Sequence, residues 1–119
     1  MLADSNVLIY AVRNTALADW LIAEMPAVSA ISMVETLGYH RIKPEEKRLL
    51  EEIFETLTVL YPTPQTFQLA TSLRQQRQMS LGDALIAATA VEYDLTLATH
   101  NMADFTDIAD LQLFDPLET

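Results

Sequence analysis

The stretch SLGDALIAATAVEYDLTLAT, residues 80–99, joins a helix pattern to a strand pattern and decides the fold class. Residues 80–94 open with a serine that can cap a helix and are then apolar on nearly every side, so they predict a buried helix. Residues 95–99 form a short apolar run with β-branched threonines and predict a strand. A buried helix followed at once by a strand is typical of α/β folds, in which helices cover both faces of a parallel sheet.

The same alternation recurs through the rest of the chain. Pro44 and Pro64 each suit the first turn of a helix, and Thr63 suits the cap before Pro64. The order of elements predicts an α/β fold with a central, mostly parallel sheet of four to five short strands flanked by helices. We expect strands at 1–4, 27–31, 58–61, 95–99 and 111–115, and helices at 5–12, 15–25, 32–42, 44–57, 63–78 and 80–94.

Length, composition and net charge limit the class of protein. With 119 residues, half of them apolar, the chain predicts one domain over residues 1–119 with a real core. The absence of cysteine excludes disulfides, thiolate metal sites and cysteine nucleophiles. No apolar run approaches the ~20 residues of a membrane span, so we expect a cytoplasmic protein. The net charge of −10 disfavours broad electrostatic binding of nucleic acid and favours cations or a basic partner.

Four carboxylates lie near strand ends or helix starts. Asp4 ends the first predicted strand, and Glu35 lies one turn into the helix after the second. Asp83 starts the apolar helix before the fourth strand, and Asp104 lies just beyond that strand. Because the carboxyl ends of parallel strands meet at one edge of a sheet, we expect these side chains to face one cleft. Each acid also has a local explanation, since Asp4 and residues 101–104 suit helix caps and the pairs 32/35 and 80/83 spell capping boxes.

Carboxylates that share a cleft repel one another, and a divalent cation relieves that repulsion. Oxygen ligands suit Mg²⁺ or Mn²⁺, which can polarise a phosphate and activate a bound water. The only histidines, His40 and His100, are too few for a zinc site, although His100 adjoins the cleft and is a candidate substrate contact.

Four segments in this order resemble a PIN domain, specifically the small single-domain toxins of VapC type. They are ADSNVLIYA (3–11), VSAISMVETLG (28–38), GDALIAATAVEYDLTLAT (82–99) and THNMADF (99–105). The resemblance implies an Mg²⁺- or Mn²⁺-dependent ribonuclease, a homodimer, and a small antitoxin whose basic tail enters the acidic cleft. Serine stands at position 5 where the family usually has threonine, and only three residues precede Asp4.

Motif position then assigns roles to individual residues. The resemblance implies that hydrolysis of RNA by metal-activated water leaves 5′-phosphate and 3′-hydroxyl ends. By the same matching, Asp4, Glu35, Asp83 and Asp104 are the catalytic acids, Asp4, Asp83 and Asp104 hold the metal, and Asn6, Thr99 and Asn101 support them.

Two alternatives stay open at this point. A catalytically silent PIN-like module would keep the fold and the partner surface without turnover. An aspartate-nucleophile phosphatase is disfavoured, because residue 6 is asparagine and residues 78–119 contain no lysine. Basic residues gather at 41–48 and 74–77; they either hold the RNA backbone or form ion pairs on solvated helix faces.

Overall fold

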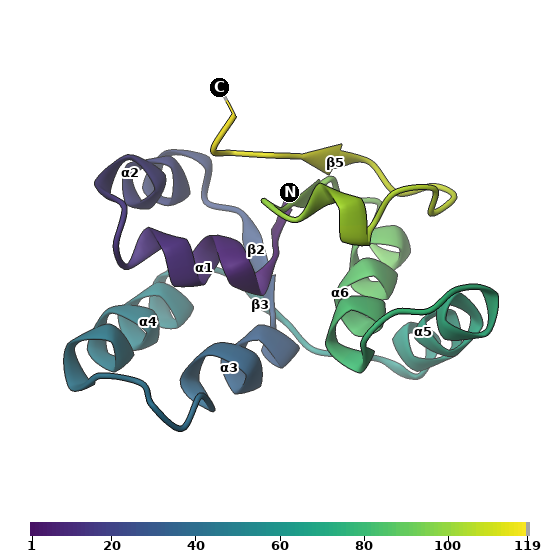
Figure 1. Ribbon diagram of the computed structural model, residues 1–119, viewed down its shortest axis with the longest axis horizontal. Coiled ribbons are helices and arrows are strands. Elements are labelled where there is room, and N and C mark those ends of the chain that lie inside the picture. Colours follow the sequence, from purple (N-terminus) through teal and green to yellow (C-terminus); the bar gives the residue numbers. More distant parts are fainter. Residues whose placement is uncertain (119) are drawn as a thin grey trace.

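The computed structural model describes residues 1–118, in which short strands alternate with helices (Figure 1). Residue 119 of the expected domain lies outside the described residues. The strands are β1 (Leu2–Ala3), β2 (Ala27–Ser29), β3 (Val59–Leu60), β4 (Leu97–Ala98) and β5 (Leu113–Phe114). The helices are α1 (Ser5–Ala11), α2 (Thr15–Glu24), α3 (Ala30–Leu37), α4 (Pro44–Thr56), α5 (Pro64–Gln76), α6 (Leu81–Glu92) and the 3₁₀ turn η1 (Met102–Asp104).

The described strands form one parallel sheet in the order β3-β2-β1-β4-β5, which confirms the expected fold class. The central strand β1 pairs on one side with β2, where Ala3 faces Val28, and on the other with β4, where Ala3 faces Ala98. The strand order reverses at β1, since β2 and β3 lie on one side of it and β4 and β5 on the other. In such sheets ligands bind at this switch point, beyond the carboxyl ends of the strands.

Helices cover both faces of this sheet. In Figure 1, α1, α2 and α4 lie to one side of the strands, and α5 and α6 lie to the other. On the first side, Val7 and Leu8 of α1 and Leu21 of α2 pack with Ala3 and Val28 of the sheet. None of the helices in residues 1–118 has the length and apolar character needed to cross a membrane.

Helix α6 is buried on nearly all sides, as its sequence predicts. Every residue from Ala84 to Ala90 is buried. One side packs on the sheet through Ile86 and Ala87 against Leu2 and Leu97, and the other packs on α5. The Ser80 hydroxyl accepts from the backbone N–H of Asp83, so the predicted helix start is correct.

Helix α3 begins earlier than the sequence suggests. It starts at Ala30, because the Ser29 hydroxyl accepts a hydrogen bond from the N–H of Ile31 and caps the helix. The capping box expected from Ser32 and Glu35 is therefore wrong. Ser32 lies inside the helix, fully buried, and both side chains are left to make contacts with other elements.

Candidate active site at the carboxyl edge of the sheet

Asp4 occupies the centre of the carboxyl edge, directly after β1 and at the N-cap of α1. Its Oδ1 accepts from the N–H of Ser5 at 2.8 Å, and its Oδ2 accepts from the hydroxyl of Thr99 at 2.8 Å. The side chain is only 4% exposed. Burial raises the pKa of Asp4 to about 6; the two hydrogen bonds oppose this, and the charges of Asp83 and Glu35 add to it. An ionised Asp4 is therefore costly in the absence of a cation.

Of the predicted supporting residues, Thr99 binds Asp4 directly, and Asn6 and Asn101 bind Thr99. Thr99 is fully buried just after β4, and Asn6 Nδ2 donates to its hydroxyl oxygen at 3.4 Å. Asn6 Oδ1 in turn accepts from the backbone N–H of His100 at 3.4 Å. Asn101 joins through its backbone N–H, which donates to Thr99 Oγ1 at 3.1 Å. Residues from α1 and from the end of β4 are thus tied into one network.

Glu35 reaches the edge from α3. The Ser5 hydroxyl lies 2.7 Å from Glu35 Oε1 and 2.8 Å from the hydroxyl of Ser32. A carboxylate only accepts, so the Ser5 proton goes to Glu35 and the Ser32 hydroxyl supplies the proton of the second bond. The contact between Ser5 and Glu35 was not identified from the sequence, since no local pattern joins residues 30 positions apart.

Gly82 makes room for Glu35 at the first turn of α6. A Cβ added to Gly82 would lie 2.2 Å from Glu35 Oε2 and 2.8 Å from its carboxyl carbon. The carboxylate therefore takes the space that any side chain at residue 82 would need. It lies beside the N-terminus of α6, where the partial positive charge of the helix favours an anion.

Asp83 and Asp104 complete the acidic set. Asp83 is half-buried in the first turn of α6, and Asp104 is exposed at the end of η1. Burial raises the pKa of Asp83, with the charge of Asp104 as the next contribution; the hydrogen bond with Ser80 opposes the shift and Glu35 adds to it. Asp83 and Glu35 likewise raise the pKa of Asp4. Each of the four acids is therefore close enough to at least one other for their charges to interact.

The donor chemistry of the edge suits Mg²⁺ or Mn²⁺. In residues 1–118, no three Asp, Glu, His or Cys side chains stand in an arrangement that could hold a metal ion. Mg²⁺ keeps several of its waters and commonly binds through one or two carboxylates together with substrate phosphate, so it needs no closed protein cage. The raised pKa of Asp4 marks where a cation would relieve the cost of charge.

Asp115 is a polar residue of this edge that sequence reasoning missed. It follows β5 directly, is 8% exposed, and accepts at Oδ1 from the N–H of Leu117 at 2.9 Å. Its Oδ2 lies 3.0 Å from His100 Nδ1. The signal was present, because an acid that ends the last predicted strand falls at the same edge as Asp4, which ends the first.

Three basic residues show two kinds of contact. Arg13, which follows α1, pairs with Glu46 of α4 at 2.7 Å, and Arg48 pairs with Glu52 one turn along α4 at 3.2 Å, the second as expected for a solvated helix face. Arg77 behaves differently, since its Nη1 donates to the backbone oxygen of Thr106 at 2.5 Å. It therefore binds the loop that follows the acid of η1.

Fold and site together define an α/β protein with a buried carboxylate, Asp4, at the switch point of a parallel sheet, within electrostatic reach of Glu35 and Asp83. A family model described as PIN domain matches residues 1–111, so the chain belongs to the PIN domain family. Ribonuclease VapC10 of Mycobacterium tuberculosis (strain CDC 1551 / Oshkosh) is 34% identical over an alignment of 118 residues, and the match covers 88% of this chain and 85% of that protein.

Solved structures agree with this membership. A toxin-antitoxin complex from Klebsiella pneumoniae contains a chain with a TM-score of 0.80 and 26% identity, covering 97% of this chain and 96% of that one. VapBC-1 from nontypeable Haemophilus influenzae gives a TM-score of 0.79 with 27% identity over 98% of both chains. The resemblance to VapC-type PIN domains is thereby confirmed.

Proposed function

We propose that the protein is the ribonuclease toxin of a toxin–antitoxin pair and hydrolyses RNA phosphodiester bonds with the help of Mg²⁺ or Mn²⁺. The observation that carries the proposal is the buried Asp4 at the carboxyl edge. Burial raises its pKa to about 6, the charges of Asp83 and Glu35 add to the shift, and the charge of Asp104 acts in turn on Asp83. A relative named as a ribonuclease and solved neighbours described as toxin-antitoxin complexes support it.

In this proposal Asp4, Asp83 and Asp104 would hold the cation, in part through its bound waters, because Mg²⁺ keeps several of them. Once bound, the cation supplies Lewis-acid polarisation of the phosphate and lowers the pKa of a nearby water. The Thr99 hydroxyl and the Ser5 N–H fix the two oxygens of Asp4. Ser5 engages Oε1 of Glu35, which leaves Oε2 to orient the attacking water and accept its proton.

Cleavage of RNA tests the proposal directly. The purified protein is incubated with transfer, ribosomal and messenger RNA in Mg²⁺, in Mn²⁺ and in EDTA, and the product ends are mapped. We expect cation-dependent cuts with 5′-phosphate and 3′-hydroxyl ends, and no cuts by Asp83→Asn. Asp94→Asn is the matched control, because Asp94 is exposed and its left-handed φ of 54° suits asparagine. Cleavage in EDTA, or cleavage by Asp83→Asn, would contradict the assignment.

Binding of the cation is measured separately through thermal unfolding. A ligand at one hundred times its Kd adds about 2.7 kcal/mol of stability by mass action. We expect Mg²⁺ or Mn²⁺ to raise the Tm of the wild-type protein and of Asp94→Asn but not of Asp83→Asn. A folded wild-type protein that gains no stability from either cation and cuts no RNA would favour the silent-module alternative.

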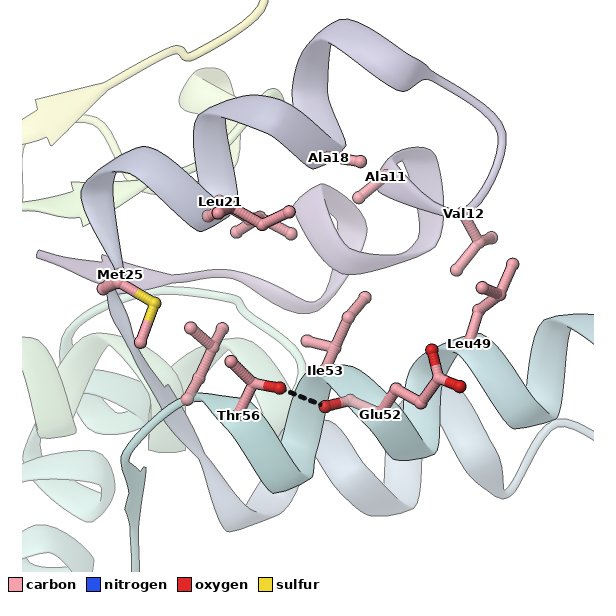
Figure 2. A pocket seen from close by; sticks show the side chains of 11 residues that line it. Ala11, Val12, Ala18, Leu21, Met25, Leu49, Glu52, Ile53 and Thr56 are labelled. Atoms are coloured by element: carbon pink, nitrogen blue, oxygen red, sulfur yellow. Dashed lines mark hydrogen bonds between the residues drawn. The ribbon is translucent and has the colours of Figure 1, made fainter.

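An apolar groove of about 200 Å³ between α2 and α4 supports the antitoxin part of the proposal. Figure 2 shows Leu21 of α2 facing Ile53 of α4, with Val12 at one end of the groove and Met25, the residue that follows α2, at the other. Exposed apolar groups continue the groove outwards, since Ile22 is 69% and Met25 is 51% exposed. The groove suits the apolar face of an antitoxin helix, while the basic tail of the antitoxin would reach the acidic edge.

The partner proposal is tested with the product of a reading frame adjacent to the toxin gene. We expect Ile22→Glu to weaken co-purification of the two proteins and to leave RNA cleavage unchanged, because the groove is separate from the acidic edge. Asp19→Asn, on the same helix, is the matched control. The proposed homodimer is measured by light scattering, and the proposed cytoplasmic location by fractionation of the cells.

A further inference from the structure

His100 is held from two sides beside the acidic edge. Its Nδ1 lies 3.0 Å from Oδ2 of the buried Asp115, and its ring meets that of Tyr10 edge-on, with the centroids 5.5 Å apart. The backbone N–H of His100 is bound by Asn6, which also contacts Thr99, the residue that donates to Asp4. The His100 ring is therefore held in place next in sequence to Thr99, whose hydroxyl binds Asp4.

These contacts determine which atom of the ring faces solvent. A carboxylate only accepts hydrogen bonds, so Nδ1 carries the proton that Asp115 binds, and in the neutral imidazole Nε2 is then a bare acceptor. Nε2 makes no hydrogen bond within residues 1–118, and no buried side-chain nitrogen or oxygen there lacks a partner. His100 is partly exposed, with 37% of its side-chain surface accessible, so Nε2 is open to a ligand.

Because Nε2 of His100 is a hydrogen-bond acceptor, it can bind only those groups of a nucleic acid strand that donate a hydrogen bond. Phosphate oxygens accept hydrogen bonds and give a bare Nε2 nothing to bind. The ribose 2′-hydroxyl donates, lies beside every phosphate of RNA, and is missing from DNA. The surrounding carboxylates are acceptors too, so the edge as a whole favours donor groups over additional anions.

We propose that His100 Nε2 accepts a hydrogen bond from a ribose 2′-hydroxyl next to the cleaved bond, and that this contact makes the site prefer RNA to DNA. Asp115 is then a positioning residue, because it sets the tautomer and the orientation of the ring without touching the substrate. This inference rests on the proposed ribonuclease activity and adds a determinant of substrate choice to it.

A series of singly modified oligonucleotides tests the contact. A 20-nucleotide RNA spanning a bond cut by the wild-type protein is made with each ribose in turn replaced by 2′-deoxyribose, and kcat/KM is measured for each. For the wild-type protein, one replacement flanking the cut should lower kcat/KM about three- to tenfold, the range of a single neutral hydrogen bond. His100→Asn keeps a nitrogen near Asp115 but lacks an atom at Nε2. The His100→Asn protein should cut the all-ribose RNA about three- to tenfold more slowly than the wild-type protein does. Its kcat/KM should not change further when the flanking ribose is replaced by 2′-deoxyribose.

Three further variants separate this contact from a structural effect. His100→Gln, whose amide reaches towards the place of Nε2, should recover part of the sensitivity to the deoxy position. Asp115→Asn should lower that sensitivity when His100 is present and change nothing further in His100→Asn. His40 is the matched control, since it also lies against a tyrosine, Tyr39, with ring centroids 5.3 Å apart, and is exposed. His40→Asn should behave as the wild-type protein does.

The outcomes are distinguishable. If His100→Asn slows the ribose and deoxyribose substrates by equal factors, the imidazole contacts a phosphate or a base and the proposal is overturned. Unchanged kinetics in His100→Asn also overturn it, and they leave the proposed ribonuclease activity intact. Absence of cleavage by the wild-type protein in Mg²⁺ and Mn²⁺ refutes the proposed function itself, before any variant is compared.

Discussion

Replacement of Asp4 by asparagine should stabilise the protein at neutral pH when no divalent cation is present. Burial lifts the pKa of Asp4 from 3.8 to about 6, a shift of about two units. At about 1.4 kcal/mol per unit, the ionised carboxylate costs at most about 3 kcal/mol of folding free energy. Asparagine keeps one acceptor oxygen for either Ser5 or Thr99, and rearrangement of the other hydrogen bond costs about 1 kcal/mol. The expected gain at pH 7 is about 1–2 kcal/mol, or roughly 4–8 °C in Tm for a domain of this size.

The gain should depend on pH in a definite direction. Because the folded-state pKa of Asp4 is raised, the folded protein binds the proton more tightly than the unfolded chain between about pH 4 and pH 6. Wild-type stability therefore falls as pH rises through that window, and Asp4→Asn lacks this contribution. Asp83 shifts in the same direction but is present in both proteins, so its effect cancels to first order in the difference.

Urea unfolding of both proteins in EDTA at pH 4, 5, 6, 7 and 8 measures this difference. The advantage of Asp4→Asn should be absent near pH 4 and complete above pH 7. Asp94→Asn, at an exposed position, should show no such pH-dependent gain. The reasoning fails if Asp4→Asn is the less stable protein at pH 7, or if its advantage is the same at every pH.

Three other changes probe the contacts of the edge and of the core. Gly82→Ala should leave Tm unchanged or raise it, since alanine stabilises a helix by about 1 kcal/mol relative to glycine. The variant should nevertheless cleave RNA at least tenfold more slowly, because the added Cβ displaces Glu35. Undiminished cleavage would refute this prediction. Ser5→Ala should slow cleavage because Glu35 loses its donor, whereas Ser5→Thr should not, and equal rates for the two variants would contradict that role. Thr66→Val removes a fully buried hydroxyl that donates to Glu92, so the free energy of unfolding measured in urea should fall by about 1–3 kcal/mol. RNA cleavage per folded molecule should not change. A stability equal to that of the wild-type protein would refute this prediction.

The fold, and with it the sheet edge at which Asp4 lies, could be predicted because both follow from the order of elements. Alternation of strand and helix patterns implies a parallel sheet, and a parallel sheet gathers its carboxyl ends at one edge. Asp4 and Asp83 were placed in this way, together with the caps at Thr63 and Ser80. Their assignment as metal ligands stays a prediction.

The contacts between elements could not be predicted in the same way. Ser5 and Glu35 are 30 residues apart, and no periodicity connects them. The space at Gly82 exists only because α3 and α6 approach each other there, so a single glycine in a helix pattern gave no sign of it. The start of α3 was misplaced because Ser29 and Ser32 are both good caps, and the end of β2 decides between them.

The parallel order of the strands has a consequence for engineering this protein. The connection between α3 and α4, residues 38–43, is largely exposed, and a chain divided there separates the site into two incomplete parts. The first part carries Asp4 and Glu35 with β1 and β2, and the second carries Asp83 and Asp104 with β3, β4 and β5. Since β1 pairs with β4 across the division, the two polypeptides regain a full acidic set only by associating. Fusing each to one half of an inducible dimer would turn the chain into a complementation reporter whose output is cut RNA.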